Sequence, residues 1–436
     1  MSGQPFSLAI GDVDKRGPLG YPQLMPRNYM HYCPPGMGGW GIVRVGLLVP
    51  ESVMLFVSPA ACGRHGAIAG FQLGFKKRLF FFHISENDVV TGQHLEKVMQ
   101  AAGEIINTIK PRPRALTICA TCVDDLLGSD YDAIAVRVEA EHKIPVRICH
   151  MDPITREGKT APEFSVQQAV YSFLPVSKVR DRSVNIIGNF APIDRDSEFH
   201  ELLLSVGFEN IRHIAACSSL EEFYQMGRSS YNILLKHPGH LAARDLQREH
   251  GIPFYFAPPA YSIDTITAVY EQLGEFLGHK LPFESYREEA LEELKQYRLS
   301  LGRIRIAVGE SINASPFELA RALTEYGFNV PYIFADNILP FDKEHIRWLQ
   351  YKRPEIKVFS NMHPTMVGFL ENSPEVDLTI GLDAGYYCSG ARVVPHSLDV
   401  QPYGYRGVLN LMRAMVQTLN KPRDHREQIY ASSIVI

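Results

Sequence analysis

Short apolar runs alternate with amphipathic stretches from about residue 40 to the end of the chain, which predicts strands separated by helices. In the middle third the pattern predicts strands at 184–188, 211–215, 233–235 and 253–256, and helices at 220–226, 242–249 and 263–277. Strands separated by helices of about 10–15 residues are typical of βαβ units and parallel sheets. We therefore expect an α/β protein built from Rossmann-like domains with parallel sheets.

The first and last thirds show the same alternation. The pattern predicts strands at 54–57, 79–82, 116–119, 146–149 and 303–308, and helices at 92–108 and 286–299. Gly207 and Gly327 each follow a predicted helix and precede an apolar strand, the usual place for a left-handed glycine. We interpret the chain as three α/β domains, at residues 1–180, 181–300 and 301–436.

Length and charge narrow the function classes. With 436 residues the chain is too long for one compact core. Lys and Arg total 44 against 48 Asp and Glu, which gives a formal net charge of −4. A sequence-independent nucleic-acid binder needs a basic face, so we expect no nucleic-acid partner.

The sequence also predicts a cytoplasmic protein with no membrane partner. Residues 1–30 contain no charged-then-apolar leader. The most apolar stretch, 41–62, is interrupted by Arg44, Pro50 and Glu51 and cannot span a bilayer.

Two nucleotide-binding motifs are weak or missing. Residues 36–41 match GxGxxG, but Cys33-Pro34-Pro35 precedes them where a strand is required, and we expect an extended apolar run after them instead of a helix. The glycines are better explained as letting the backbone wrap closely around something just after Cys33. The sequence has no GxxxxGK[ST] motif, so any ATP that drives its chemistry must be held by another protein.

The seven cysteines are the candidate chemistry; they stand at positions 33, 62, 119, 122, 149, 217 and 388. Their odd number favours a reducing compartment over a disulfide framework. Cys119 and Cys122 form a lone CxxC, which leaves open a redox pair, half of a zinc site, or one ligand beside a structural cysteine. An inert, partly buried pair is the ordinary alternative.

Three cysteines share a context. We interpret Cys33, Cys62 and Cys122 as turn residues at the ends of apolar strands, where βα loops gather on one edge of a parallel sheet. Thiolates supplied by separate loops are what an iron–sulfur cluster requires.

These contexts resemble a known family. Together with Ser-Glu-Asn-Asp-Val-Val-Thr-Gly at 85–92, Gly128-Ser129-Asp130, and His-Ser-Leu-Asp at 396–399 before Pro402, they resemble the component 1 proteins of nitrogenase and its relatives. The relatives include dark-operative protochlorophyllide reductase, the nickel-tetrapyrrole reductase of methanogens, methylthio-alkane reductase and cofactor-assembly scaffolds. The resemblance covers nearly the whole chain and implies the component 1 fold of three Rossmann-like domains.

The resemblance also implies ligands and partners. Cys33, Cys62 and Cys122 match the family cysteines that hold a cluster between paired subunits, an eight-iron P-cluster or a four-iron cluster. Three cysteines leave either cluster short of ligands, so we expect a second component 1-type subunit, in a homodimer or a heterodimer. An ATP-hydrolysing iron protein is the implied electron donor.

Two histidines are further candidates for a second metallocluster or a substrate site. His396 matches a histidine that ligates the active-site cofactor of the nitrogenase α-type subunit; the alternative is a histidine that only forms hydrogen bonds. His237 lies where that subunit carries its cofactor-anchoring cysteine, which this chain lacks, and a structural role is the alternative. We interpret Cys119 and Cys149 as core residues; Cys217 is either packed or recruited, and Cys388 falls in a loop suited to lining a pocket.

The sequence thus predicts an oxidoreductase, a subunit of the catalytic component of a nitrogenase-like two-component reductase. Its cluster would relay electrons to a site between the three domains. Two alternatives stay open: a non-catalytic scaffold for assembly or transfer of an iron–sulfur cofactor, and a Rossmann-type enzyme in which every cysteine is structural.

Overall fold

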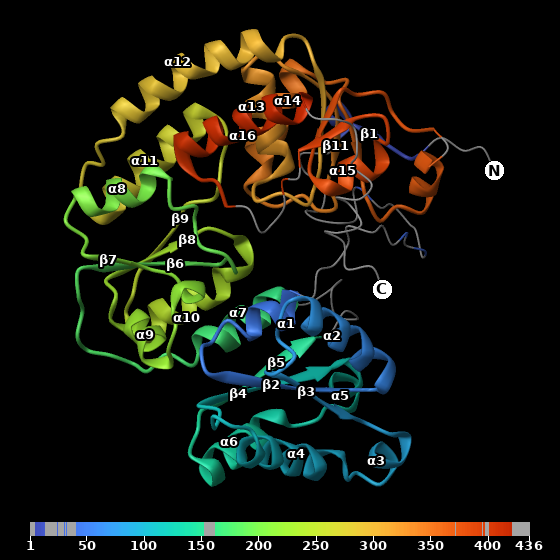
Figure 1. Cartoon of the computed structure of the whole chain (residues 1–436), viewed down its shortest axis with the longest axis vertical. Helices are drawn as coiled ribbons and strands as arrows, with labels where there is room; N and C mark the ends of the chain where they lie inside the picture. The colour runs from blue at the N-terminus through green and yellow to red at the C-terminus, as the bar shows by residue number, and fades with distance from the viewer. Residues whose placement is uncertain are drawn as a thin grey trace. The chain divides into compact units, whose positions relative to one another are not determined.

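The computed structural model describes residues 5–13, 24, 30, 32, 41–151, 162–370, 372–394, 396 and 401–420. The fold is α/β with three sheets, parallel except for one antiparallel edge strand, and flanking helices, which confirms the predicted fold class (Figure 1). The described residues form two compact units: unit 1 comprises those within 1–37, 193–206 and 258–435, and unit 2 those within 38–192 and 207–257. The domain boundaries at residues 180 and 300 stay a prediction.

Unit 2 contains two four-stranded parallel sheets, and the first has the strand order β3-β2-β4-β5. Its strands are β2 (Ser52–Ser58), β3 (Leu79–His83), β4 (Ala115–Thr121) and β5 (Val146–Met151). Its helices are α1 (Gly41–Gly46), α2 (Ala60–Gln72), α3 (Glu86–Val90), α4 (His94–Thr108), α5 (Cys122–Leu127), α6 (Tyr131–His142) and α7 (Pro162–Tyr171).

Helices cover both faces of this sheet (Figure 1). Leu55 of β2 packs in one core with residues of α4 and α6, whereas its neighbour Phe56 packs in another with residues of α1 and α7. Every residue of β2 and β4 is buried. Burial on both faces explains why these strands read as continuous apolar runs instead of an alternating pattern.

The second sheet of unit 2 has the order β7-β6-β8-β9. Its strands are β6 (Ser183–Ile187), β7 (Asn210–Arg212), β8 (Tyr231–Leu234) and β9 (Phe254–Phe256), and its helices are η4 (Ile214–Ala216), α9 (Leu220–Gln225), η5 (Met226–Arg228), η6 (His237–Gly239) and α10 (His240–His250). The core beneath α1 and α7 continues through Tyr171 to Leu234 and Leu246. The two sheets therefore share one hydrophobic core.

Unit 1 contains a six-stranded sheet of order β1-β12-β11-β10-β13-β14. Its strands are β1 (Leu8–Ala9), β10 (Arg305–Val308), β11 (Asn329–Phe334), β12 (Lys357–Phe359), β13 (Leu378–Ile380) and β14 (Arg392–Val394). Its helices are η1 (Ile10–Asp12), α8 (Glu198–Ser205), α11 (Ile263–Leu277), α12 (Glu284–Leu301), α13 (Pro316–Glu325), α14 (Asp342–Lys352), η7 (Pro364–Leu370), α15 (Leu382–Tyr387) and α16 (Gly404–Leu419).

The first strand joins this sheet from the far end of the sequence. β1 pairs antiparallel with β12, with Leu8 opposite Val358, whereas β10 to β14 are mutually parallel. The sequence gives no local signal for such a two-residue edge strand, because only pairing with β12 stabilises it.

Two local predictions have clear outcomes. Gly207 and Gly327 follow α8 and α13 with φ of 92° and 86°, which confirms the predicted left-handed conformation. The extended run expected after Gly41 is wrong, because residues 41–46 form helix α1. A short apolar segment that is buried on most sides does not show whether its period is that of a helix or a strand.

A buried carboxylate joins α8 to the start of α16. Glu198 is fully buried; its Oε1 accepts hydrogen bonds from the backbone N of Tyr405 (2.6 Å) and the hydroxyl of Tyr270 (2.8 Å), and its Oε2 accepts from the backbone N of Arg406 (3.1 Å). The first N–H groups of a helix have no intrahelical partner, so this carboxylate caps α16. Gly404 has φ +73°, and a Cβ atom there would collide with Glu198 Oε1 and the Tyr270 hydroxyl.

We predict that Gly404→Ala destabilises unit 1 by about 3 kcal/mol, because left-handed strain adds to the collision with Glu198. Gly278→Ala is the matched control: Gly278 has the same φ of +73° but no atom within 4 Å of the added Cβ, so it should cost only about 1 kcal/mol. Urea unfolding of both variants measures the difference, and equal losses would contradict the role of the Glu198 cap.

Candidate functional site

In each sheet the chain adds parallel strands on one side of the first parallel strand and then crosses to its other side. The strand order therefore reverses beside that first strand. In β3-β2-β4-β5 the chain leaves β2 toward β3 on one side and returns to β4 on the other; the equivalent reversals lie between β6 and β8 and between β10 and β13. At such a switch point the connections diverge and open a crevice at the carboxyl ends of the strands, where open parallel sheets bind ligands. The residues that follow these three strand pairs are therefore the candidate site residues.

The first switch point carries two of the predicted cysteines. β2 and β4 run side by side, from Ser52 opposite Ala115 to Phe56 opposite Cys119. Cys62 is the third residue of α2, directly after β2, and Cys122 is the first residue of α5, directly after β4; both thiols are half-buried. Both cysteines lie in the first turns of helices, so their predicted placement in turns is wrong in this detail.

The backbone beside Cys62 packs closely on the sheet edge. A Cβ atom on Gly63 would lie 2.6 Å from His83 Cε1 and 3.2 Å from Ser58 Oγ. His83 is the last residue of β3 and pairs in register with Ser58 at the end of β2. Glycine at this position therefore lets α2 begin directly over the ends of two strands, which fixes Cys62 at the carboxyl edge.

Two hydroxyl groups at this edge lack partners. Ser58 and Thr121 are the last residues of β2 and β4 and are 0% and 1% exposed. Within the described ranges, neither hydroxyl oxygen has a hydrogen-bond partner. Buried polar atoms are rarely left unpaired, so this edge fits a site that a bound group or ordered water completes.

A buried polar cluster lies behind Cys122. Asp124 is 1% exposed, and its Oδ1 lies 3.8 Å from His94 Nε2, which in turn lies 3.2 Å from Ser129 Oγ. Burial raises the pKa of the Asp124 carboxyl, and the nearby Tyr131 and His94 partly oppose this. Sequence reasoning missed the cluster because His94 comes from α4, and only the tertiary fold brings it to α5.

The other cysteines of the prediction lie elsewhere. Cys33 is outside the described residues. Cys119 and Cys149 are buried register partners on β4 and β5, in agreement with their interpretation as core residues. Cys388 is buried in the core of unit 1. Across the described ranges, no three His, Cys, Asp or Glu side chains are grouped so as to hold a metal ion.

His237 lies at the second switch point, as the first residue of η6 after β8. Its ring makes an edge contact with Phe164 at 5.2 Å between ring centroids and stacks on His240 at 5.9 Å. Burial, followed by the nearby His240, lowers the pKa of His237, so the ring is favoured in its neutral form. Cys217 follows β7 of the same sheet and is half-buried, with its Sγ 3.6 Å from the carbonyl oxygen of His213.

His396 belongs to a buried hydrogen-bond network in unit 1. Its Nε2 lies 2.7 Å from the Tyr261 hydroxyl and 2.8 Å from Asn313 Oδ1, and the Tyr261 hydroxyl donates to the same Asn313 oxygen at 2.6 Å. Asn313 Nδ2 donates to the carbonyl oxygen of Pro402 at 2.9 Å. Metal ligation through Nε2 would break two of these contacts; the ligand role of His396 stays a prediction.

Carboxyl groups occupy the third switch point. Asp383, after β13, accepts hydrogen bonds at Oδ2 from the backbone N of Glu310 (2.7 Å), which follows β10, and from Asn361 Nδ2 (3.2 Å). Burial, followed by repulsion from Asp336, raises the pKa of Asp383 to about 6. Burial, with repulsion from Asp336 and Asp383, also raises the pKa of Glu310. Local sequence patterns do not predict this cluster, because its members follow different strands.

A match to a family model classifies the chain. Residues 38–420 match the family model described as "Nitrogenase component 1 type Oxidoreductase". The chain belongs to this family. The resemblance predicted from the cysteine contexts is confirmed.

Individual relatives are distant but cover most of the chain. The nitrogenase iron-molybdenum cofactor biosynthesis protein NifE of Rhodobacter capsulatus is 24% identical over 92% of this chain and 88% of its own length. The nitrogenase iron-iron protein beta chain of the same organism is 22% identical over 77% of this chain and 82% of its own. The structure titled "Nitrogenase Cp1 at pH 6.5" superposes with a TM-score of 0.69 at 15% identity, covering 94% of this chain and 95% of that one. This last match confirms the component 1 type of fold.

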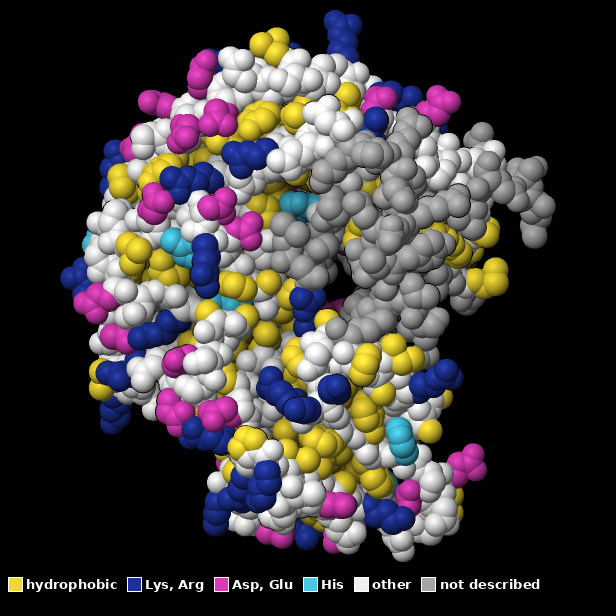
Figure 2. Space-filling model, in the orientation of Figure 1, with side chains coloured by type: hydrophobic (Ala, Val, Ile, Leu, Met, Phe, Trp, Pro, Cys, Tyr) yellow, Lys and Arg dark blue, Asp and Glu magenta, His cyan; other side chains and the backbone are white. Residues whose placement is uncertain are grey.

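The distribution of charged side chains on the surface agrees with the nearly equal numbers of basic and acidic residues. Lys and Arg side chains are interspersed with Asp and Glu side chains over the described part of the face drawn in Figure 2. Among the described helices, none combines the length and apolarity needed to cross a membrane.

We predict that Asp383→Asn changes the pH dependence of stability. The folded-state pKa of Asp383, about 6, is above its unfolded value of 3.8, so ionisation of this group lowers stability as pH rises from about 4 to about 6. The asparagine variant lacks this loss, and its stability relative to the native chain should rise by up to about 3 kcal/mol across that window. Urea unfolding at several pH values measures the difference, and a constant offset between the two proteins would contradict the prediction.

Proposed function

We propose that this chain is a subunit of the catalytic component of a nitrogenase-like, ATP-dependent two-component reductase. The observation that supports this proposal is the location of Cys62 and Cys122 at one switch point, after two adjacent parallel strands. Family membership supplies the chemical setting, because component 1 proteins are oxidoreductases by the description of their family.

In this proposal Cys33, Cys62 and Cys122 hold an iron–sulfur cluster, with eight or four irons, that accepts and passes on single electrons when bound. Cys62 lies in the N-terminal turn of α2, where helix N–H groups stabilise a bound group that carries negative charge. Gly63 keeps that turn close to the sheet edge, and the hydroxyl groups of Ser58 and Thr121 are available there as hydrogen-bond donors.

The proposal requires two partners. The sequence has no P-loop, so an ATP-hydrolysing iron protein must supply the electrons. Three cysteines do not complete a four-iron or eight-iron cluster, so a second component 1-type subunit, identical or different, must supply the remaining ligands. His396 and His237 are the proposed residues of a second metallocluster or substrate site, and a cytoplasmic location suits the reduced thiols.

A scaffold is the second candidate function. Relatives that cover most of this chain are named as iron-molybdenum cofactor biosynthesis proteins. The chain also lacks a cysteine at the second switch point, where Lys236 and His237 follow β8. Such a protein would hold a cluster on the same cysteines and transfer a cofactor to another enzyme without turnover.

We predict that Cys62→Ala removes most of the bound iron and acid-labile sulfide from protein purified without oxygen. Loss of one thiolate leaves an open ligand position, which destabilises the whole cluster. Iron and sulfide analysis with EPR of the dithionite-treated protein measures the effect. Cys149→Ala, a buried cysteine on the neighbouring strand β5, is the control and should retain the iron. Equal iron content in both variants and the native chain would rule out the cluster on Cys62.

We further predict that the cluster-loaded chain, with its partner subunit, oxidises a reduced iron protein only in the presence of ATP and a reducible substrate. Oxidation of the iron protein, followed by EPR, together with ATP hydrolysis, measures this activity. A scaffold instead gives no turnover but transfers iron to an acceptor protein, and that result would replace the first candidate with the second.

A further inference from the structure

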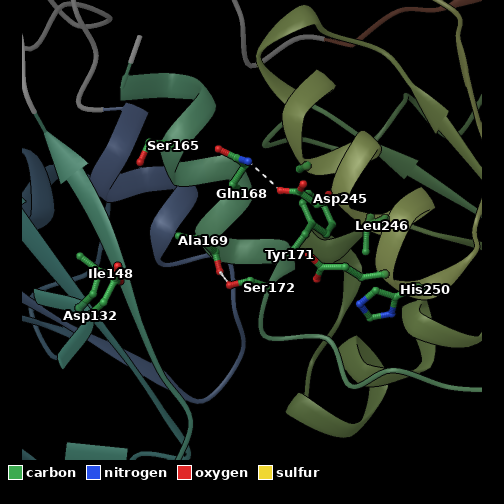
Figure 3. A pocket seen from close by; sticks show the side chains of 12 residues that line it. Asp132, Ile148, Ser165, Gln168, Ala169, Tyr171, Ser172, Asp245, Leu246 and His250 are labelled. Carbon is green, nitrogen blue, oxygen red and sulfur yellow. Dashed lines mark hydrogen bonds between the residues drawn. The ribbon is translucent and has the colours of Figure 1, made fainter. Parts of the chain in front are cut away.

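A carboxylate without partners lies in the core of unit 2. Asp124 of α5 is 1% exposed, and within the described ranges neither of its carboxylate oxygens has a hydrogen-bond partner. Asp245 of the same unit shows the usual situation: it accepts a hydrogen bond from Gln168 at 2.7 Å (Figure 3) and pairs with Arg248 at 2.8 Å. A buried charge without such partners is costly, so Asp124 requires a compensating group.

The side chains around Asp124 are also incompletely bonded. Tyr131 of α6 and His94 of α4 are 2% and 7% exposed, and both lie near the Asp124 carboxyl group. The Tyr131 hydroxyl and His94 Nδ1 have no hydrogen-bond partner among the described residues. Ser129, which follows α5, is the third neighbour, and its hydroxyl lies 3.2 Å from His94 Nε2. Polar atoms from α4, α5 and α6 therefore meet at one buried place without satisfying one another.

No side chain with a permanent positive charge compensates Asp124 in the described part of the chain. Its ion-pairing neighbour there is His94, with Nε2 3.8 Å from Asp124 Oδ1, and an imidazole is charged only when protonated. A water molecule would add hydrogen bonds but no charge. A bound cation would neutralise the carboxylate and also coordinate the oxygen atoms of the nearby hydroxyl groups.

The donor atoms select the kind of cation. Carboxylate and hydroxyl oxygens are hard ligands, which alkali and alkaline-earth ions prefer. One carboxylate balances one positive charge, whereas a divalent ion would leave a net charge in the core. The described residues also contain no group of three His, Cys, Asp or Glu side chains that could hold a divalent ion. We propose that Asp124, Tyr131 and Ser129 bind a monovalent alkali cation, K⁺ or Na⁺.

The bound cation connects elements that meet at the first switch point. Asp124 belongs to α5, which begins at Cys122, and Tyr131 is the first residue of α6. A shared ion holds these two helices together, and it fixes the helix that carries Cys122. The ion itself needs no thiolate, so the site does not depend on the proposed iron–sulfur cluster.

Thermal unfolding of the full chain in KCl, NaCl and choline chloride at equal ionic strength tests the proposal. We expect the unfolding midpoint to be about 2 °C or more higher in KCl or NaCl than in choline chloride, because only the folded chain binds the ion. Asp124→Asn removes the charged ligand and should abolish this difference. Tyr131→Phe removes one hydroxyl ligand with little change in packing and should reduce it.

Asp125→Asn is the matched control. Asp125 is the next residue of α5, is exposed, and pairs with His150 at 2.9 Å, so its variant should keep the full difference between the salts.

Two results would overturn the proposal. Equal midpoints of the native chain in the three salts would mean that a proton or a water molecule completes the polar cluster. A difference that stays unchanged in the Tyr131→Phe and Asp124→Asn variants would mean that the ion binds elsewhere; if Asp124→Asn does not fold, Tyr131→Phe decides. The readout is folding stability, and the test therefore succeeds or fails independently of the reductase proposal.

Discussion

The organisation of this protein depends on the polarity of its parallel sheets. Crossover connections place the carboxyl ends of all parallel strands at one edge, and a reversal of strand order opens a crevice there. The three sheets apply this constraint with different residues at the switch point: thiols at Cys62 and Cys122, His237 in the second sheet, and the Glu310 and Asp383 carboxyl groups in the third. The same backbone design therefore offers three chemically distinct edges.

Buried polar groups give unit 1 its specific packing. The Glu198 carboxylate satisfies N–H groups at the start of α16, and the Tyr261 hydroxyl connects His396 to Asn313. A buried group of this kind is costly unless each polar atom is paired, so it favours one arrangement of the chain over others. The contacts of His396 with Tyr261 and Asn313 therefore account for its burial without a metal or substrate.

The first switch point differs from these satisfied networks. The hydroxyl groups of Ser58 and Thr121 are buried without partners among the described residues, and the neighbouring Cys62 and Cys122 are half-buried. A complete polar network at Glu198 and an incomplete one at the cysteines are consistent with a structural role for the first and a binding role for the second.

Local sequence patterns are enough to predict the α/β class and many of its helices and strands. The predicted helix at 263–277 is α11, and the predicted strands at 79–82 and 146–149 lie within β3 and β5. Long amphipathic helices show a helical repeat of apolar residues, and strands buried on both faces show short apolar runs. Both signals are local in the sequence and can be predicted from it. The motif contexts around Cys62 and Cys122 also carry the resemblance to the family, because they are local in the sequence.

Other features depend on contacts between segments that are distant in the sequence. The short segment 41–46 is helical because of its burial, and β1 exists only through its pairing with β12. The meeting of His94 with Asp124, and of Asp383 with Glu310, joins residues that follow different elements. Such contacts depend on strand order and crossover direction, which local sequence periodicity does not encode.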